Sequence, residues 1–299
     1  MPVGNERFFT KEHIQAHVFG TSTVLAEQAV HCLELVASLS RAGLGYQFKG
    51  GNSLLLVLDT PLRFSIDVDI ATDEPRERIE ECVDRVVRDY GAFTRWTRRR
   101  HKTKPWLPIA SYYLFFDSHF ASPDDAFIML DVQLRRSPYT TGMKPVACGD
   151  IYTADAQVEL PLPSSIIGDK LLTLGPATLG IPVGKGKEAQ RLKHVFDVST
   201  LLGMHPDLHD IRRSFHACME HENSLQETKM SVTEVLDDTL AFCGSVARYE
   251  RPPEVAPGTA SVLAENVTGL APFADHLFAR EYSWQQLQKD TARAAACIT

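Results

Sequence analysis

One stretch of sequence decides the fold of this chain: Lys49-Gly-Gly-Asn-Ser-Leu-Leu-Leu-Val-Leu-Asp-Thr-Pro-Leu-Arg-Phe-Ser-Ile-Asp-Val-Asp-Ile70. A glycine pair opens an apolar run, and a basic turn then leads to Asp67 and Asp69. Successive residues of a β-strand point to opposite faces, so these two carboxylates share one face and the hydrophobic residues beside them share the other. Like charges held side by side are costly unless a cation lies between them. The pattern therefore predicts a divalent-metal site, and the glycine turn indicates that the metal serves a phosphate chain.

The glycine pair Gly50-Gly51 is predicted to form a phosphate-binding turn between a short strand and a short helix. Because glycine lacks a side chain, backbone N–H groups can approach a phosphate closely there. The N-terminus of the following helix also presents N–H groups to an anion. Ser53 adds a hydroxyl that can bond a phosphate oxygen. The alternative is an ordinary turn in which Ser53 caps the helix, and the downstream aspartates favour the phosphate interpretation.

A third carboxylate, Asp131, lies in a segment of alternating apolar and polar residues and points to the less apolar face of its predicted strand. Magnesium takes oxygen ligands from a few carboxylates, substrate phosphates and water. Two such ions, roughly 3.5–4 Å apart, can activate an attacking oxygen and stabilise a leaving pyrophosphate. We therefore expect Asp67, Asp69 and Asp131 to hold Mg²⁺, with Mn²⁺ as an alternative. For any one of them alone, a solvated strand edge is the simpler interpretation.

The hydrophobic pattern predicts an α+β fold: a mixed β-sheet with flanking helices over residues 1–162, then an all-helical domain over 163–299. Strands are expected at 46–48, 66–71, 107–116, 126–135 and 157–160. One or two helices are expected within 11–42, one or two after a loop at 251–260, and others at 53–58, 75–90, 164–174, 187–202, 208–220 and 232–246.

Composition is that of an ordinary soluble protein, with 44% hydrophobic and 23% charged residues. The formal net charge of −7 argues against a protein that coats nucleic acid through general basicity. No apolar run is long enough to span a membrane, and the polar N-terminus lacks the apolar core of a signal peptide. The six cysteines are scattered singly, as in reduced intracellular proteins. The sequence therefore predicts a cytoplasmic protein that does not enter a membrane.

The densest basic run lies between Arg95 and Trp106, with two tryptophans interleaved. Arginines on phosphates and aromatic rings on unstacked bases are how single-stranded RNA is often held. The alternative is a basic hairpin whose tryptophans pack inward. Arg63 and the pair Arg135-Arg136 would extend the same positive surface. The candidate RNA-binding residues are Arg95, Arg98, Arg99, Arg100, Lys102 and Lys104.

With these motifs the sequence resembles the AbiEii and MenT nucleotidyltransferase toxins of bacterial type IV toxin–antitoxin systems, within the DNA polymerase β-like nucleotidyltransferase superfamily. The resemblance covers about residues 46–202. It includes the Lys49-Gly-Gly turn and Ser65, two residues before the first aspartate. Lys170 matches a downstream lysine of the family. Asp197 matches the second aspartate of an Arg-Asp-x-x-Asp-Leu-like segment, in which His194 replaces the first.

The resemblance implies a role for each matched residue. Asp67 and Asp69 would hold the metals, and Asp131 would help to activate the acceptor hydroxyl. Lys170 would neutralise triphosphate charge, while Asp197 would orient Lys170 or the base. The residues expected to bind the nucleotide are Lys49, Gly50, Gly51, Ser53, Ser65 and Lys170, and those expected to be catalytic are Asp67, Asp69, Asp131, Lys170 and Asp197.

The expected function is a metal-dependent nucleotidyltransferase toxin. It would transfer a nucleoside monophosphate from an NTP to an RNA acceptor, the tRNA 3′ end by resemblance, and so block translation. A separately encoded antitoxin is the implied partner. Two alternatives stay open at this point. The acceptor could be a protein or a small molecule, or the chain could be a nucleotide-binding regulatory protein without turnover, since His194 departs from the family motif.

Overall fold

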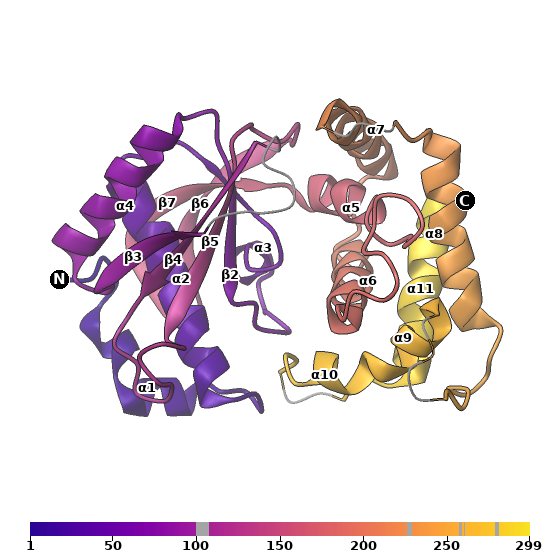
Figure 1. Cartoon of the computed structure of the whole chain (residues 1–299), viewed down its shortest axis with the longest axis horizontal. Helices are drawn as coiled ribbons and strands as arrows, with labels where there is room; N and C mark the ends of the chain where they lie inside the picture. Colours follow the sequence, from indigo (N-terminus) through magenta and orange to yellow (C-terminus); the bar gives the residue numbers. More distant parts are fainter. Residues whose placement is uncertain (100–107, 226–228, 257–258, 260, 279–280) are drawn as a thin grey trace. The chain divides into compact units, whose positions relative to one another are not determined.

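The computed structural model describes residues 1–99, 108–225, 229–256, 259, 261–278 and 281–299. They form two compact units (Figure 1). The first unit takes its residues from 1–137, 141–161 and 276–279, and the second from 138–140, 162–275 and 280–299. The strands of the described residues belong to the first unit, and the second unit is built from helices.

The first unit contains a seven-stranded mixed sheet in the order β3-β4-β5-β2-β1-β7-β6. The pairs β2–β5 and β1–β7 are parallel and the other neighbours are antiparallel. The strands are β1 (Gln47–Lys49), β2 (Asp67–Ala71), β3 (Arg95–Arg99), β4 (Ile109–Phe115), β5 (Phe127–Gln133), β6 (Thr141–Cys148) and β7 (Tyr152–Pro161). The helices are η1 (Glu6–Phe9), α1 (Lys11–Ala16), α2 (Thr23–Arg41), α3 (Leu54–Val57) and α4 (Arg76–Tyr90).

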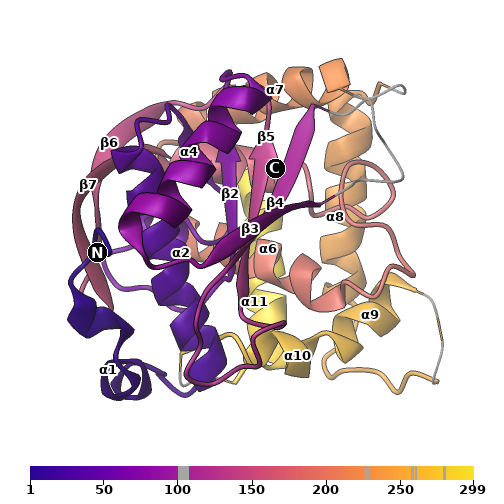
Figure 2. The same ribbon diagram turned by 60° about the vertical axis from the view of Figure 1, so that its left-hand side comes forward.

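Helices α2 and α4 cover one face of this sheet (Figures 1 and 2). The apolar side chains of that face are buried in the core. Burial alternates along the two central strands, β2 and β5, as expected for strands with one face in the core. Their inward residues are Val68, Ile70, Ile128, Leu130 and Val132, all essentially inaccessible to solvent. The same alternation places Asp67, Asp69 and Asp131 on the other face, as the sequence predicts.

Strand register aligns polar residues in one row across the carboxylate face. Asp69 of β2 pairs with Asp131 of the parallel strand β5 and with Lys49 of β1. Asp131 in turn pairs with Ser111 of β4, and Ser111 pairs with Arg99 of β3. The row therefore carries two carboxylates in its middle and a cationic residue at each end.

The predicted α+β class is confirmed, but the sequence missed two strands. The basic strand β3 lacks the apolar alternation that identifies a strand, because four of its five side chains are exposed. Strand β6 contains Gly142 and Pro145, which argue against a strand. Since β6 lies at the sheet edge, a proline is tolerated there. Strand β7 also begins at Tyr152, earlier than the expected segment 157–160.

The second unit consists of helices, several of which match the expected segments. They are α5 (Pro163–Leu171), α6 (Glu188–Leu202), α7 (Leu208–Leu225), α8 (Val232–Ala247), α9 (Val262–Thr268), α10 (Leu270–Ala274) and α11 (Trp284–Ile298). Residues 257, 258 and 260 of the expected loop at 251–260 lie outside the described residues. After this loop, the described residues form three helices where one or two were expected. In the described parts of the chain, no helix combines the length and the apolar character needed to cross a membrane.

Candidate active site

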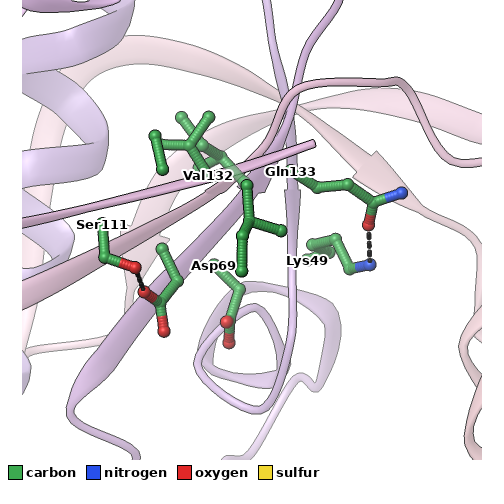
Figure 3. Close-up of a pocket in the computed structure, with 9 residues that line it drawn as sticks. Lys49, Asp69, Ser111, Val132 and Gln133 are labelled. Atoms are coloured by element: carbon green, nitrogen blue, oxygen red, sulfur yellow. Dashed lines mark hydrogen bonds between the residues drawn. The ribbon is translucent and has the colours of Figure 1, made fainter. Parts of the chain in front are cut away.

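A cavity of about 230 Å³ opens at the carboxylate row of the sheet (Figure 3). It is lined by residues of β1, β2, β4 and β5, so four strands contribute to one site. The lining residues are Lys49, Asp69, Ile70, Ile109, Ala110, Ser111, Asp131, Val132 and Gln133. The structure thus brings together Lys49, Asp69 and Asp131, which the sequence predicted for metal or nucleotide binding.

Ser111 is a member of this site that sequence reasoning missed. Its hydroxyl donates a hydrogen bond to Oδ1 of Asp131, and only 2% of the residue is exposed. The bond holds one oxygen of the Asp131 carboxylate in place and thereby restricts rotation of the whole group. No local signal marks Ser111, because the contact depends on the pairing register of β4 with β5.

Lys49 places an ammonium group at the other end of the cavity. Its Nζ donates to Oε1 of Gln133 at 3.0 Å and to Oγ of Ser137 at 3.4 Å. Both partners are neutral oxygen acceptors, and Lys49 also pairs in register with Asp69 of β2. A cation beside two carboxylates can attract the phosphate groups of a nucleotide.

Other side chains lie close to both glycines of the turn, and Gly50 also has a backbone conformation that favours glycine. Gly50 has φ of +74°, and a Cβ there would lie 1.9 Å from Oδ2 of Asp69. A Cβ on Gly51 would lie 2.6 Å from Nη2 of Arg63 and 3.1 Å from Oγ of Ser65. The turn is therefore packed directly against the catalytic candidates, which is where the sequence placed it.

Two residues near the turn differ from their expected surroundings. Ser53 donates its hydroxyl to the carbonyl oxygen of Gly50 at 2.8 Å and makes no cap hydrogen bond to α3. The alternative role as a helix cap is thus not what the structure shows. Arg63 is only 6% exposed and donates to the carbonyl of Phe64 at 3.1 Å, so it does not extend a basic surface.

We predict that Gly50→Ala displaces the Asp69 carboxylate and abolishes most of the activity. The added Cβ overlaps Oδ2 of Asp69, and alanine at a positive φ costs about 1–2 kcal/mol in addition. The matched control is Gly149→Ala, because Gly149 has φ of +50° and open space around its Cβ position. Thermal melts and nucleotidyl transfer of both variants check this. Similar transfer by the two variants would contradict a specific role for the turn.

Asp67 lies on β2, two residues before Asp69, and is not among the residues that line the cavity. The other two predicted catalytic residues, Lys170 and Asp197, lie in the second unit. Nζ of Lys170 forms an ion pair with Oδ2 of Asp197 at 2.9 Å, and the two residues are 7% and 0% exposed. Nδ1 of His194 lies 2.9 Å from Oγ1 of Thr173. Asp197 is therefore beside the lysine that the resemblance expects it to orient, whereas the roles of these residues in catalysis stay predictions.

The candidate RNA-binding residues divide between two faces of the sheet. Arg98 pairs with Glu80 of α4, and Nε1 of Trp96 donates to Asp84 of α4 at 2.7 Å, so both lie on the helix-covered face. Arg95 and Arg99 lie on the carboxylate face. Arg100, Lys102 and Lys104 lie outside the described residues. Of the other arginines, Arg136 forms an ion pair with Glu159.

The carboxylates that line the cavity suit a metal ion that binds together with a substrate. Among the residues that the structure describes, no three His, Cys, Asp or Glu side chains are grouped closely enough to hold a metal ion. Asp69 and Asp131 nevertheless pair in register and line the same cavity. Magnesium is commonly bound by one or two carboxylates together with substrate phosphates and water. The residues present therefore fit magnesium bound with a nucleotide better than a metal held by protein alone.

Comparison with solved structures identifies the class of fold. The chain is similar to MenT4, a nucleotidyltransferase toxin from Mycobacterium tuberculosis H37Rv, with a TM-score of 0.54 and 16% sequence identity. The similarity covers 96% of this chain and 91% of that one. At this identity the likeness concerns the fold, which is that of a nucleotidyltransferase. No curated protein matches the chain in sequence.

A match to a protein-family model shows the family to which the chain belongs. The family model described as "Nucleotidyl transferase AbiEii toxin, Type IV TA system" matches residues 34–274. The chain belongs to this family and is a nucleotidyltransferase toxin, which confirms the resemblance seen in its motifs. The match extends beyond the motifs at 46–202 and reaches far into the second unit. The family implies an NTP substrate and an antitoxin partner.

Proposed function

We propose that this enzyme transfers a nucleoside monophosphate from an NTP to the 3′ hydroxyl of an RNA, with tRNA as the first candidate, and so blocks translation. The observation that carries this proposal is the row formed by Lys49, Asp69, Asp131 and Ser111, which lines one cavity beside the glycine turn. A cation and a glycine turn suit a triphosphate, while a carboxylate held by a serine suits an attacking hydroxyl.

Asp69 and Asp131 are the residues that would hold magnesium, with Asp67 on the same face of β2. When bound with the nucleotide, magnesium or manganese would neutralise charge on the phosphates. The protein itself supplies the positions of the groups around it. Lys49 and the backbone N–H groups at Gly50 and Gly51 would contact the phosphates.

The acceptor hydroxyl is activated by Asp131 in this proposal. The hydroxyl oxygen forms a bond to the α-phosphorus, the bond from that phosphorus to the β-phosphate oxygen breaks, and pyrophosphate leaves. The hydroxyl proton passes to the Asp131 carboxylate. Ser111 holds Oδ1 of that carboxylate, so Oδ2 is the oxygen that accepts the proton. Lys170 and Asp197 keep the roles that the resemblance predicts for them, triphosphate charge and orientation.

A cytoplasmic location and control by a separately encoded antitoxin complete the proposal. NTPs and tRNA are cytoplasmic, and a toxin that consumes them needs a partner that restrains it. Because the family belongs to type IV toxin–antitoxin systems, it supports an antitoxin partner without identifying it.

The test is purified protein incubated with magnesium, total tRNA and each of the four NTPs labelled at the α-phosphate. We expect label in RNA with one preferred nucleotide, release of pyrophosphate, and loss of both on chelation. Mapping the labelled end identifies the acceptor hydroxyl. Label in protein or in an added aminoglycoside, with none in RNA, would redirect the proposal to another acceptor. Nucleotide binding without pyrophosphate release from any acceptor would contradict the transfer itself.

A further inference from the structure

The carboxylate face of the sheet continues, away from the cavity, into a surface of aromatic side chains. One step along the strands from the carboxylate row, Tyr113 of β4 pairs with Met129 of β5. Two residues further, Phe115 pairs with Phe127. We call Tyr113, Phe115, Phe127 and Met129 the aromatic strip. Because side chains alternate, its members share the face of Ser111 and Asp131.

The rings of the aromatic strip contact one another and remain partly exposed. The ring centroids of Tyr113 and Phe127 lie 4.8 Å apart at 70°, and those of Phe115 and Phe127 lie 5.7 Å apart at 56°. All four residues of the strip are half-buried, whereas their neighbours Tyr112, Leu114 and Ile128 on the helix-covered face are fully buried. The rings are thus fixed by each other while part of their surface faces away from the core.

Two exposed arginines border the aromatic strip. Arg95 pairs in register with Phe115, and its guanidinium carbon lies 3.3 Å from the centre of that ring. Arg99 pairs with Ser111, and its Nη1 lies 3.3 Å from Sδ of Met129. Both are exposed. The strip therefore combines partly exposed rings with cations that neither of these contacts neutralises.

We propose that the aromatic strip holds the unpaired nucleotides at the 3′ end of the acceptor RNA, an inference that rests on the proposed transfer to RNA. Aromatic rings stack on unstacked bases of any sequence, and arginines contact the phosphates between them. The strip leads directly to Asp131, which would receive the terminal hydroxyl. A protein partner is a poorer fit, because its binding would not require the strip to end at the catalytic row.

The length of the strip sets the size of the ligand. Phe127 lies four residues from Asp131 along β5, a distance of about 13 Å for an extended strand. Stacked nucleotides advance about 3.4 Å each, so the path from Phe127 over the strip to Asp131 spans roughly four of them. The acceptor is therefore an RNA with a single-stranded 3′ overhang of about four nucleotides, and a blunt duplex end would not reach along the rings.

The first experiment varies the acceptor. One RNA hairpin is prepared with 3′ overhangs of increasing length, from a blunt end to about six nucleotides, which exceeds the span of the strip. With the wild-type enzyme we expect the KM for RNA to fall as the overhang grows to about four nucleotides and then to level off. The affinity of each hairpin, measured by fluorescence anisotropy without NTP, should follow the same order. A KM and an affinity that do not depend on overhang length would overturn the inference.

The second experiment varies the strip. Tyr113→Ala should raise the KM for RNA about tenfold or more, the scale of one lost base stack, and should flatten its dependence on overhang length. Tyr113→Phe keeps the ring and should behave as wild type. Arg95→Gln should raise the KM and weaken its salt dependence. The matched controls are Tyr249→Ala and Arg88→Gln, an exposed tyrosine of the second unit and an exposed arginine of α4.

The outcomes separate this inference from the proposed function. In every variant, NTP binding and the melting temperature show whether the nucleotide site and the fold are intact. If wild type labels RNA but Tyr113→Ala leaves both the KM and its overhang dependence unchanged, the strip inference fails and the proposed function stands. If wild type labels no RNA yet binds overhangs through Tyr113, the proposed transfer fails, and the strip is a binding surface for single-stranded RNA without an acceptor role. Failure of labelling and of Tyr113-dependent binding together overturns both.

Discussion

Asp69→Asn should lower nucleotidyl transfer by about 10³-fold, the scale for removing one group that stabilises charge in a transition state. The substitution preserves the shape of the side chain that packs against Gly50. It removes one negative charge from the pair that Asp69 forms in register with Asp131. The loss of activity would therefore report the charge at this position rather than the packing of the turn. Transfer of α-labelled nucleotide, at saturating NTP, is the measurement.

The same variant should be at least as stable as wild type when no nucleotide is present. Two neighbouring carboxylates repel each other, so neutralising one relieves a cost that the folded protein carries. Magnesium with NTP should raise the melting temperature of wild type, because a ligand that binds only the folded state stabilises it, and should raise that of Asp69→Asn less. Melting is measured with and without magnesium and NTP.

Asp155→Asn is the matched control, since the Asp155 side chain is 99% exposed on β7. It should change neither transfer nor the response to magnesium and NTP. An Asp69→Asn enzyme that retains near-normal transfer would remove Asp69 from the catalytic machinery. A large loss of stability in that variant would assign the carboxylate a structural role instead.

The face that carries the carboxylates could be predicted from sequence because the reason is local. The apolar residues Val68 and Ile70 must enter the core, and strand alternation then fixes where Asp67 and Asp69 point. Asp131 followed from the same rule on its own strand. The glycine turn was also predictable, since its residues are adjacent in the chain and their chemistry is unusual.

The partners of these residues could not be predicted, because they depend on register between distant strands. Ser111 meets Asp131 only because β4 pairs with β5 at one alignment, and Gln133 of β5 meets Lys49 of β1 across the intervening strand β2. The basic run between Arg95 and Trp106 was not predicted to contain a strand. Because the run is mostly charged, it lacks the apolar alternation that would identify the edge strand β3. Within that strand, alternation places Arg98 beside α4 and Arg99 on the carboxylate face.

Lys170→Met should destabilise the second unit by about 3–5 kcal/mol. Lys170 and Asp197 form a buried ion pair, and Asp197 is fully buried. Removing the lysine leaves a carboxylate charge without this partner in the protein interior, which costs far more than the pair contributes. The matched control is Arg213→Met, because the pair of Arg213 with Asp210 is largely exposed and should contribute less than about 1 kcal/mol. Denaturant unfolding of both variants measures the difference.

The double variant Lys170→Met/Asp197→Leu separates stability from catalysis. Replacing both members of a buried pair by apolar residues is often neutral or stabilising, so we expect it to recover most of the stability lost in Lys170→Met. Transfer should nevertheless stay low, because the resemblance assigns Lys170 to the triphosphate. Recovery of stability together with full transfer would show that this pair is structural only. A double variant as unstable as Lys170→Met would mean that Asp197 is held in the fold by contacts beyond the lysine.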